Sequence, residues 1–282
     1  MSTELPGREL PSRDLNARAD IAAINAALPE SAVPALIRGF AILDLISQSP
    51  GLDFTSIHSR LGLPKSSTHN LLVTLCRLGV LKLQPDRSYV LGLRLTELGT
   101  FAASQRFIEK ESVPLLRVLA REERLTCHLG VREGREAVYL SKCESDPPIK
   151  IDSWVGKRFP LHSSALGKAL LAWLPPNELA RAIEDMPGDK RLPNAIGQPE
   201  DLQAHLALVR AQGFATEDEE NISNVRCVAA PVFDLKGGVV AAISAIGPAL
   251  QFDKNRFDQL APRLIATASE ISRRSFGAKT DE

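Results

Sequence analysis

The sequence predicts an α+β protein with an N-terminal winged helix-turn-helix, joined by a helix to a C-terminal α/β domain built on an antiparallel sheet. Three observations lead to this class. The chain has 282 residues, which is more than one average domain. Residues 33–91 contain three helical patterns followed by a hairpin pattern. After residue 109, pairs of strands alternate with helices, which favours an α+β arrangement.

The same patterns divide the chain into four segments. We expect a flexible arm over residues 1–30, the winged helix-turn-helix over 31–92, a linker helix over 93–108 and a C-terminal α/β domain over 109–277. Residues 1–30 are polar and rich in charge, so they lack the apolar core of a secretory signal.

Composition and charge exclude several classes of protein. Hydrophobic residues make up 44% and charged residues 24%, which excludes wholesale disorder. No apolar run is long enough to cross a bilayer. The 4 cysteines never form C-x-x-C, which argues against a zinc cluster or a disulfide framework and favours the reducing cytoplasm. Because 34 basic residues balance 34 acidic ones, any contact with nucleic acid must come from a local patch.

Start and stop signals delimit the first two helices of the winged helix-turn-helix. Pro34 suits the first position of a helix that Ser49-Pro50-Gly51 ends. Asp53 or Thr55 can cap a second helix, and Gly62 can end it.

The third helix opens at residues 63–67 and ends at Gly79. Its predicted buried stripe consists of Leu71, Leu72, Leu75 and Leu78. Residues 80–84 and 88–91 then predict a hairpin around Pro85-Asp86-Arg87, and residues 93–107 continue as the connecting helix.

The second domain alternates hairpins with helices. Its predicted elements are a helix over 112–121, a hairpin of strands 127–131 and 137–143, a strand over 149–155, helices over 163–174 and 201–212, a hairpin of strands 225–233 and 239–246, and a terminal helix that Asp253 caps and that runs to about residue 275.

The first turn of the third helix is the candidate contact with DNA. A recognition helix presents this turn to the major groove, and residues 65–70 place short polar donors there. Lys65 and Arg38 can neutralise phosphates, and Ser66 or Ser67 can cap the helix as well as bind phosphate.

Three further side chains can read or clamp the duplex. Asn70 has the donor and acceptor that read adenine, His69 can contact guanine, and Arg87 lies at the tip of the wing. The complete predicted set is Arg38, Lys65, Ser66, Ser67, Thr68, His69, Asn70 and Arg87. The alternative is that the Ser-Ser-Thr sequence only caps a helix and the lysine is solvated. The preceding helix, the glycine turn and the wing favour DNA binding.

Ordered sequence blocks across residues 33–275 resemble the IclR family of bacterial transcription regulators. The blocks are GLPKS at 62–66, LLVTL at 71–75, YVLG at 89–92, VGKR at 155–158, PLH at 160–162, ALGKALLA at 165–172, EE at 219–220, CVAAPV at 227–232 and IGP at 246–248. The resemblance implies an N-terminal winged helix, a C-terminal domain that binds a small effector, and assembly into homodimers or tetramers.

The resemblance also implies an effector site. Its residues would be Ile151, Phe159, Ala165, Leu166, Glu217, Val225, Cys227, Ser244 and Ile246. Independently, the small residues of 163–167 would let a ligand approach a helix N-terminus whose free amides suit a carboxylate. The alternatives are core packing for Cys227 and Ile246, and a solvated acidic run for Glu217.

The chain departs from the family pattern at two positions. Asn70 stands where relatives commonly have arginine, which shifts the expected contact towards adenine. Ile246 stands where some carboxylate-binding relatives have a second serine beside the equivalent of Ser244. Losing that hydroxyl favours an aromatic or larger carboxylate over a compact polar anion.

Signals of catalysis are absent from the sequence. Lys168 is not part of a P-loop, because His162 and Ala169 stand where glycine and a hydroxyl residue are required. The 5 histidines are dispersed and match no metal motif. We therefore expect no catalytic residue, no metal and no cofactor.

The resulting prediction is a ligand-responsive regulator of a catabolic operon that binds double-stranded DNA and a small organic or aromatic acid, without a membrane. Repression is favoured, with activation as the alternative. The rivals are an enzyme with a winged-helix docking module and a DNA-binding protein that no longer responds to ligand.

Overall fold

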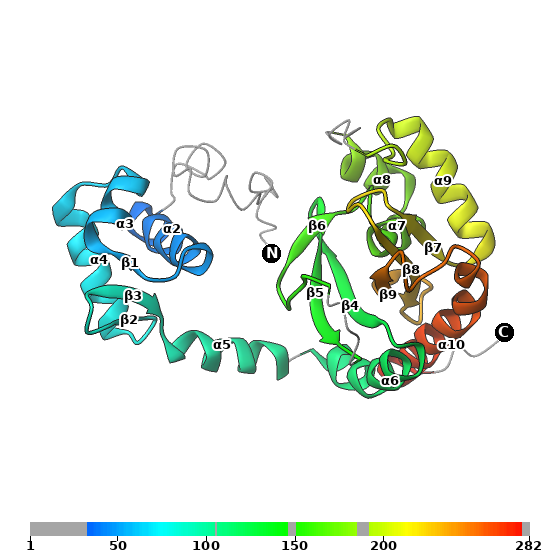
Figure 1. Ribbon diagram of the computed structural model, residues 1–282, viewed down its shortest axis with the longest axis horizontal. Coiled ribbons are helices and arrows are strands. Elements are labelled where there is room, and N and C mark those ends of the chain that lie inside the picture. Colours follow the sequence, from blue (N-terminus) through cyan, green and yellow to red (C-terminus); the bar gives the residue numbers. More distant parts are fainter. Residues whose placement is uncertain (1–32, 105, 146–150, 185–191, 278–282) are drawn as a thin grey trace, which may run out of the picture. The chain divides into compact units, whose positions relative to one another are not determined.

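The computed structural model describes residues 33–104, 106–145, 151–184 and 192–277 (Figure 1). The chain separates into two compact units, Met1–Gln105 and Arg106–Glu282. The predicted arm over residues 1–30 lies outside the described residues.

The N-terminal unit has the predicted winged helix-turn-helix architecture. Its elements are α2 (Pro34–Gln48), β1 (Leu52–Asp53), α3 (Phe54–Leu61), α4 (Lys65–Arg77), β2 (Leu81–Leu83), β3 (Ser88–Leu91) and α5 (Leu93–Ser104). The strands form an antiparallel sheet in the order β1-β3-β2. Isoleucine and leucine side chains from α2, α3, α4 and β2 form its core.

Most of the predicted helix boundaries in this unit are confirmed. Pro34 occupies the first turn of α2. Asp53 caps α3, because its carboxylate accepts a hydrogen bond from Ser56 N at 2.9 Å. Gly62 ends α3 in the left-handed conformation, with φ at 60°. Short β1 was not predicted and adds a third strand to the hairpin.

Two predictions about α4 are wrong. Neither Ser66 nor Ser67 caps the helix, because α4 already begins at Lys65 and both serines lie inside its first turn. Leu78 does not belong to the buried stripe. Since α4 ends at Arg77, Leu78 leaves the helical face and its side chain is 61% exposed.

The C-terminal unit is built on one antiparallel sheet. Its elements are α6 (Phe107–Glu123), β4 (Thr126–Glu133), β5 (Glu136–Cys143), β6 (Arg158–Pro160), α7 (Ala165–Leu171), α8 (Pro176–Ile183), α9 (Pro199–Gln212), β7 (Ala215–Asp218), β8 (Val225–Phe233), β9 (Val239–Pro248) and α10 (Arg256–Phe276). The six strands have the order β6-β5-β4-β9-β8-β7.

Helices cover both faces of this sheet (Figure 1). Helices α6 and α10 pack on one face, where leucines of both helices meet side chains of β4, β5, β8 and β9. Helices α7, α8 and α9 pack on the other face. Arg263 of α10 forms ion pairs with Glu122 and Glu123 of α6 and so ties the first pair of helices together.

The connection between the units differs from the predicted continuous helix. Helix α5 ends at Ser104 and α6 begins at Phe107. Arg106 has the extended conformation of an N-cap, with φ −101° and ψ 93°. The connecting helix predicted over 93–107 is therefore α5, which ends earlier than expected, and the helix predicted over 112–121 is α6, which begins earlier and ends later.

Three predictions in the C-terminal unit are wrong. In the predicted strand over 149–155, the described residues 151–155 are not strand, because Ser153 N bonds back to Ile151 O at 2.9 Å. The helix predicted over 163–174 is confined to α7, Ala165–Leu171. Asp253 does not occupy the N-cap of α10. It accepts a hydrogen bond from Asn255 N, and Asn255 is the N-cap.

Three elements of this unit, β6, α8 and β7, were not predicted at all. Among the described residues, no helix is long and apolar enough to cross a membrane.

Candidate DNA-binding and effector-binding sites

The first turns of α4 present a polar face to solvent. Lys65, Ser66, His69 and Asn70 are exposed, and Ser67 is half-buried. The opposite side of the helix packs into the core through Leu72, which is 1% exposed. This division follows from the helical period, which separates the residues of 65–70 between two faces.

Thr68 belongs to the core side of α4 and not to its exposed polar side. Its side chain is 0% exposed, and its hydroxyl donates to Pro64 O at 3.1 Å. The prediction that Thr68 contacts DNA is therefore wrong. It lies one helical turn before Leu72, so both side chains point inward.

Arg87 lies at the tip of the wing, as predicted, and is exposed. It adopts φ 67°, and its amide donates to Gln84 O at 3.0 Å. Asp86 fixes the turn by accepting from the amide and hydroxyl of Ser88 at 3.0 and 2.7 Å, and these bonds lower the pKa of Asp86. Arg38 is half-buried on α2.

Strand register in the C-terminal unit brings the predicted effector residues to one face of the sheet. Glu217 of β7 lies opposite Cys227 of β8, and Cys227 lies opposite Ile246 of β9. Val225 and Ser244 share this face, because side chains alternate along a strand.

The apolar members of the predicted site pack in a single cluster with α7. Ile151, Phe159, Ala165 and Leu166 join Val225, Cys227 and Ile246 there. Leu166 packs so close to β4 that a Cβ atom added at Gly130 would lie 2.8 Å from its Cδ2. The core-packing alternative for Cys227 and Ile246 therefore describes part of their role.

The N-terminus of α7 is not free to bind a ligand in the way that the sequence suggested. Ala165 N donates to the carboxyl of Glu217 at 3.4 Å, and Gly167 N donates to Ser164 Oγ at 3.0 Å. The expectation of free amides is wrong for these two groups, because the chain supplies its own acceptors.

Glu217 is a buried acid and not a member of a solvated run. The residue is only 3% exposed. Burial raises the pKa of Glu217 to about 7, although the nearby charge of Lys168 acts in the opposite direction. At neutral pH this carboxyl group therefore exists in both protonation states.

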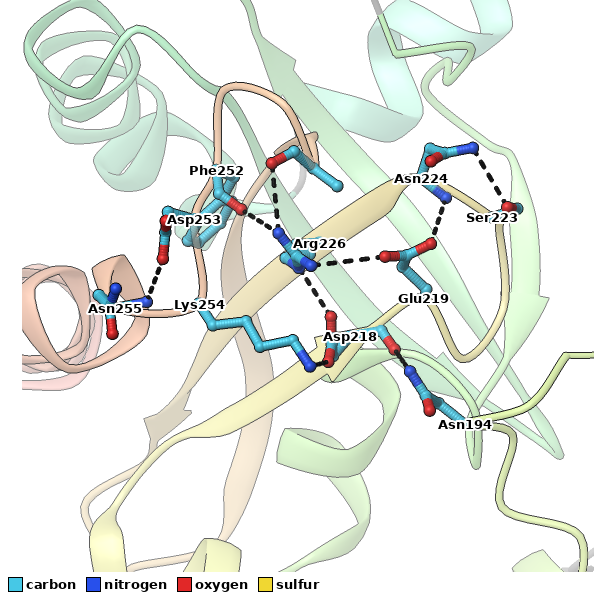
Figure 2. Close-up of polar contacts among 11 residues, drawn as sticks. Asn194, Asp218, Glu219, Ser223, Asn224, Arg226, Phe252, Asp253, Lys254 and Asn255 are labelled. Carbon is cyan, nitrogen blue, oxygen red and sulfur yellow. Dashed lines mark hydrogen bonds and ion pairs between the residues drawn. The ribbon is translucent and has the colours of Figure 1, made fainter.

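A network on the opposite side of β7 fixes the orientation of Glu217 (Figure 2). Asp218 accepts from Arg226 Nε at 2.7 Å and pairs with Lys254 at 2.5 Å. Arg226 also donates to Phe252 O at 3.0 Å. Since neighbouring side chains of a strand point to opposite faces, holding Asp218 outward holds Glu217 inward.

Sequence reasoning missed an aromatic and histidine cluster on the same inner face. The ring of Tyr139 stacks on that of His128, with centroids 4.0 Å apart, and packs at a tilt against that of Phe159, with centroids 4.3 Å apart. His128 is 0% exposed and lies directly opposite Ser244. The only sequence signal for His128 was the alternation of side chains along residues 127–131. That alternation places His128 in the site only once β4 is known to pair with β9.

Together, the two units form a winged-helix DNA-binding domain and a ligand-binding domain, which is the architecture of a transcription regulator. Residues 35–85 match the IclR helix-turn-helix domain, and residues 100–273 match the C-terminal domain described as bacterial transcriptional regulator IclR. The chain belongs to the IclR family of bacterial transcription regulators, which are not enzymes.

Individual relatives agree with this family. The chain is 38% identical over 246 residues to the HTH-type transcriptional regulator RhmR of Escherichia coli, covering 87% of this chain and 95% of RhmR. It is 34% identical over 244 residues to the HTH-type transcriptional repressor AllR of Klebsiella pneumoniae, covering 84% and 88%. The crystal structure of Thermotoga maritima IclR superposes with a TM-score of 0.74 at 31% identity, covering 86% of this chain and 98% of that one.

Proposed function

We propose that this protein represses a catabolic operon in the cytoplasm and that a small organic or aromatic acid releases it from its operator. The observation that carries the DNA-binding part is the division of α4 into an exposed polar face and a buried apolar one. Lys65, His69 and Asn70 are all exposed on this helix, whereas Leu72 is buried.

In the proposed complex, α4 lies in the major groove. Lys65 and Arg38 neutralise phosphates, and the serines of the first turn bind phosphate. Asn70 reads adenine and His69 contacts guanine. Arg87 at the tip of the wing clamps the backbone or the minor groove.

Exposed apolar residues of the N-terminal unit support assembly with a second copy. Helix α5 has no buried residue, and its apolar side chains Leu93 and Phe101 are 80% and 66% exposed. On α2, Leu36 and Phe40 are 62% and 60% exposed. A homodimer or a tetramer would cover these side chains and would place two recognition helices about 34 Å apart or a multiple of it.

The effector site of this proposal is the inner face of the C-terminal sheet. An acid is expected because the hydroxyl group of Ser244 and the imidazole of His128 lie on this face. An aromatic acid is expected because Tyr139, Phe159 and Ile246 supply an apolar surface there. Repression is supported by the similarity to AllR, which is named a repressor.

The effector acts in this proposal by binding more tightly to one placement of the paired winged helices than to another. A ligand can shift such an equilibrium only by its difference in affinity for the two states. Helix α5 joins the winged helix to the effector domain in sequence, so we assign to it the transmission of this bias.

Two linked measurements test the proposal. Fluorescence anisotropy with the DNA upstream of the adjoining operon should show specific binding that a carboxylate weakens. The same carboxylate should raise the melting temperature of the protein, as RT ln(1 + [L]/Kd) requires. Specific DNA binding that no metabolite alters would favour a regulator that no longer responds to ligand. Turnover of a metabolite would favour the enzymatic alternative.

A further inference from the structure

His128 carries a buried nitrogen atom that the protein does not satisfy. Its Nε2 lies 2.8 Å from Ser153 Oγ, whereas Nδ1 has no hydrogen-bond partner in the described part of the chain. The residue is 0% exposed. Buried polar groups almost always have a partner, so an orphaned one in a binding domain indicates a partner from outside the chain.

Counting donors and acceptors assigns the proton on the ring. If the Ser153 hydroxyl donates to Nε2, the hydroxyl hydrogen is used and Nδ1 carries the ring proton. If Nε2 donates instead, both the hydroxyl hydrogen and the lone pair of Nδ1 lack a partner in the described ranges. The first arrangement leaves one group unsatisfied and the second leaves two. His128 therefore presents an Nδ1–H donor.

His128 offers an anion a neutral donor and not a cation. Burial is the main cause that lowers the pKa of His128 to about 3, and the nearby ammonium groups of Lys142 and Lys157 lower it further. These two lysines are themselves paired with Glu144 and Asp152, at 2.7 and 4.0 Å. The attraction for an anion therefore comes from the Nδ1–H donor, and Glu217 of the edge strand β7 would oppose an anion when ionised.

The position of His128 on the sheet supplies a second donor and a flat neighbour. Ser244 lies directly across the β4–β9 pair, where opposed Cβ atoms are about 5 Å apart. The stacked ring of Tyr139 holds the imidazole in place. At the N-terminus of α7, by contrast, Glu217 and Ser164 already accept the amides of Ala165 and Gly167.

We propose that His128 determines effector specificity by donating a hydrogen bond from Nδ1 to a carboxylate oxygen of the ligand, beside Ser244. The carboxylate then lies at the β4–β9 pair and not at the N-terminus of α7. This inference rests on the proposed function, because it deepens the description of the same effector site.

The test compares two substitutions of His128 in the full-length protein. His128→Phe keeps a ring stacked on Tyr139 but removes both nitrogens, and His128→Asn keeps a short N–H donor. Isothermal titration uses a fixed panel of benzoate, 4-hydroxybenzoate, pyruvate and glyoxylate. For the acid that binds the parent best, H128F should raise Kd about 10- to 100-fold, as the loss of a bond to a charged group implies, and H128N should restore most of the affinity.

Controls separate this inference from the proposed function. His205 is half-buried on α9 of the same domain, and His205→Phe should leave Kd unchanged. Unliganded H128F should melt close to the parent, because it removes the unsatisfied Nδ1–H group but also the acceptor of the Ser153 hydroxyl. If the parent binds an acid and H128F binds it equally well, or if H128N fails as completely as H128F, the role of His128 is overturned. If no acid on the panel binds the parent, the acid-sensing function itself fails, and the inference fails with it.

Discussion

The ammonium group of Lys168 donates hydrogen bonds to both carboxylate oxygens of Glu220, at 2.7 and 2.6 Å, inside the C-terminal domain. Lys168 lies on α7 and its side chain is 0% exposed, and that of Glu220, in the segment between β7 and β8, is 7% exposed. The pair therefore joins α7, which carries the predicted effector residues Ala165 and Leu166, to the segment that follows Glu217 of β7.

Removing one member of this pair should strongly destabilise the domain. Lys168→Met leaves the Glu220 carboxylate buried without its cationic partner, and we expect a loss of about 3–5 kcal/mol in the free energy of unfolding. The double substitution Lys168→Met/Glu220→Leu should recover most of this loss, because it removes both charges. Urea denaturation followed by circular dichroism measures all three proteins. A single variant as stable as the parent would show that the pair is not isolated from water.

The raised pKa of Glu217 should make part of the stability depend on pH. Its ordinary value of 4.5 applies to the unfolded chain, and burial raises it to about 7 in the folded protein. The folded state therefore binds the proton more tightly, so this contribution is complete below pH 4.5 and is lost as the pH rises to about 7.

Glu217→Gln isolates that contribution. The free energy of unfolding of the parent, minus that of the variant, should fall by about 3 kcal/mol between pH 4.5 and 7, since each pKa unit corresponds to about 1.4 kcal/mol. Histidine titrations occur in both proteins and cancel in the difference. Denaturation at a series of pH values provides the test, and a flat difference would contradict the assigned burial.

Asn70 and Thr68 should differ sharply in their effect on DNA binding, although both lie in α4. Asn70→Ala should cost about 1–3 kcal/mol and relax the preference for one base pair, because its side chain is exposed on the groove face. Thr68→Val should preserve operator preference and cost about 1 kcal/mol of stability, because it loses only the bond to Pro64 O. Competition binding against operators with single base changes distinguishes the two, and the reverse ranking would refute the orientation of α4.

Helix α5 should be required for the effector to act on DNA binding. Gly99 lies within it, and a Cβ atom added there would meet nothing within 4 Å. Gly99→Pro should break the helix and uncouple the effector from operator release, whereas Gly99→Ala should keep the coupling. The measured quantity is the ratio of operator Kd with and without effector. An unchanged ratio in G99P would remove α5 from the mechanism.

Local signals in the sequence were sufficient for the winged helix-turn-helix. Pro34, Asp53 and Gly62 mark helix ends through their own backbone and side-chain chemistry, and the structure confirms each. Thr68 shows where this reasoning stops. A polar residue within a polar run looks exposed until the helical phase relative to Leu72 is applied, and that phase places it inside.

The effector site needed tertiary information that the sequence does not contain. Glu217 lies in a four-residue strand of composition Ala-Thr-Glu-Asp, which has no apolar alternation to reveal β7. His128 becomes a candidate only through its pairing with Ser244, a partner far along the chain. The family resemblance supplied most of the lining residues, whereas the small residues of 163–167 suggested free helix amides, which Glu217 and Ser164 occupy here.

The most direct test of the central claim is the affinity of a Lys65→Ala/Ser67→Ala/Asn70→Ala triple variant for the operator. Fluorescence anisotropy measures this affinity, and circular dichroism checks that the variant is folded. These side chains are partly or fully exposed on α4, so the variant should remain folded. We predict that it loses specific binding and retains only a weak, salt-sensitive affinity for any DNA. A folded triple variant that binds the operator as tightly as the parent would contradict the assignment of α4 as the recognition helix.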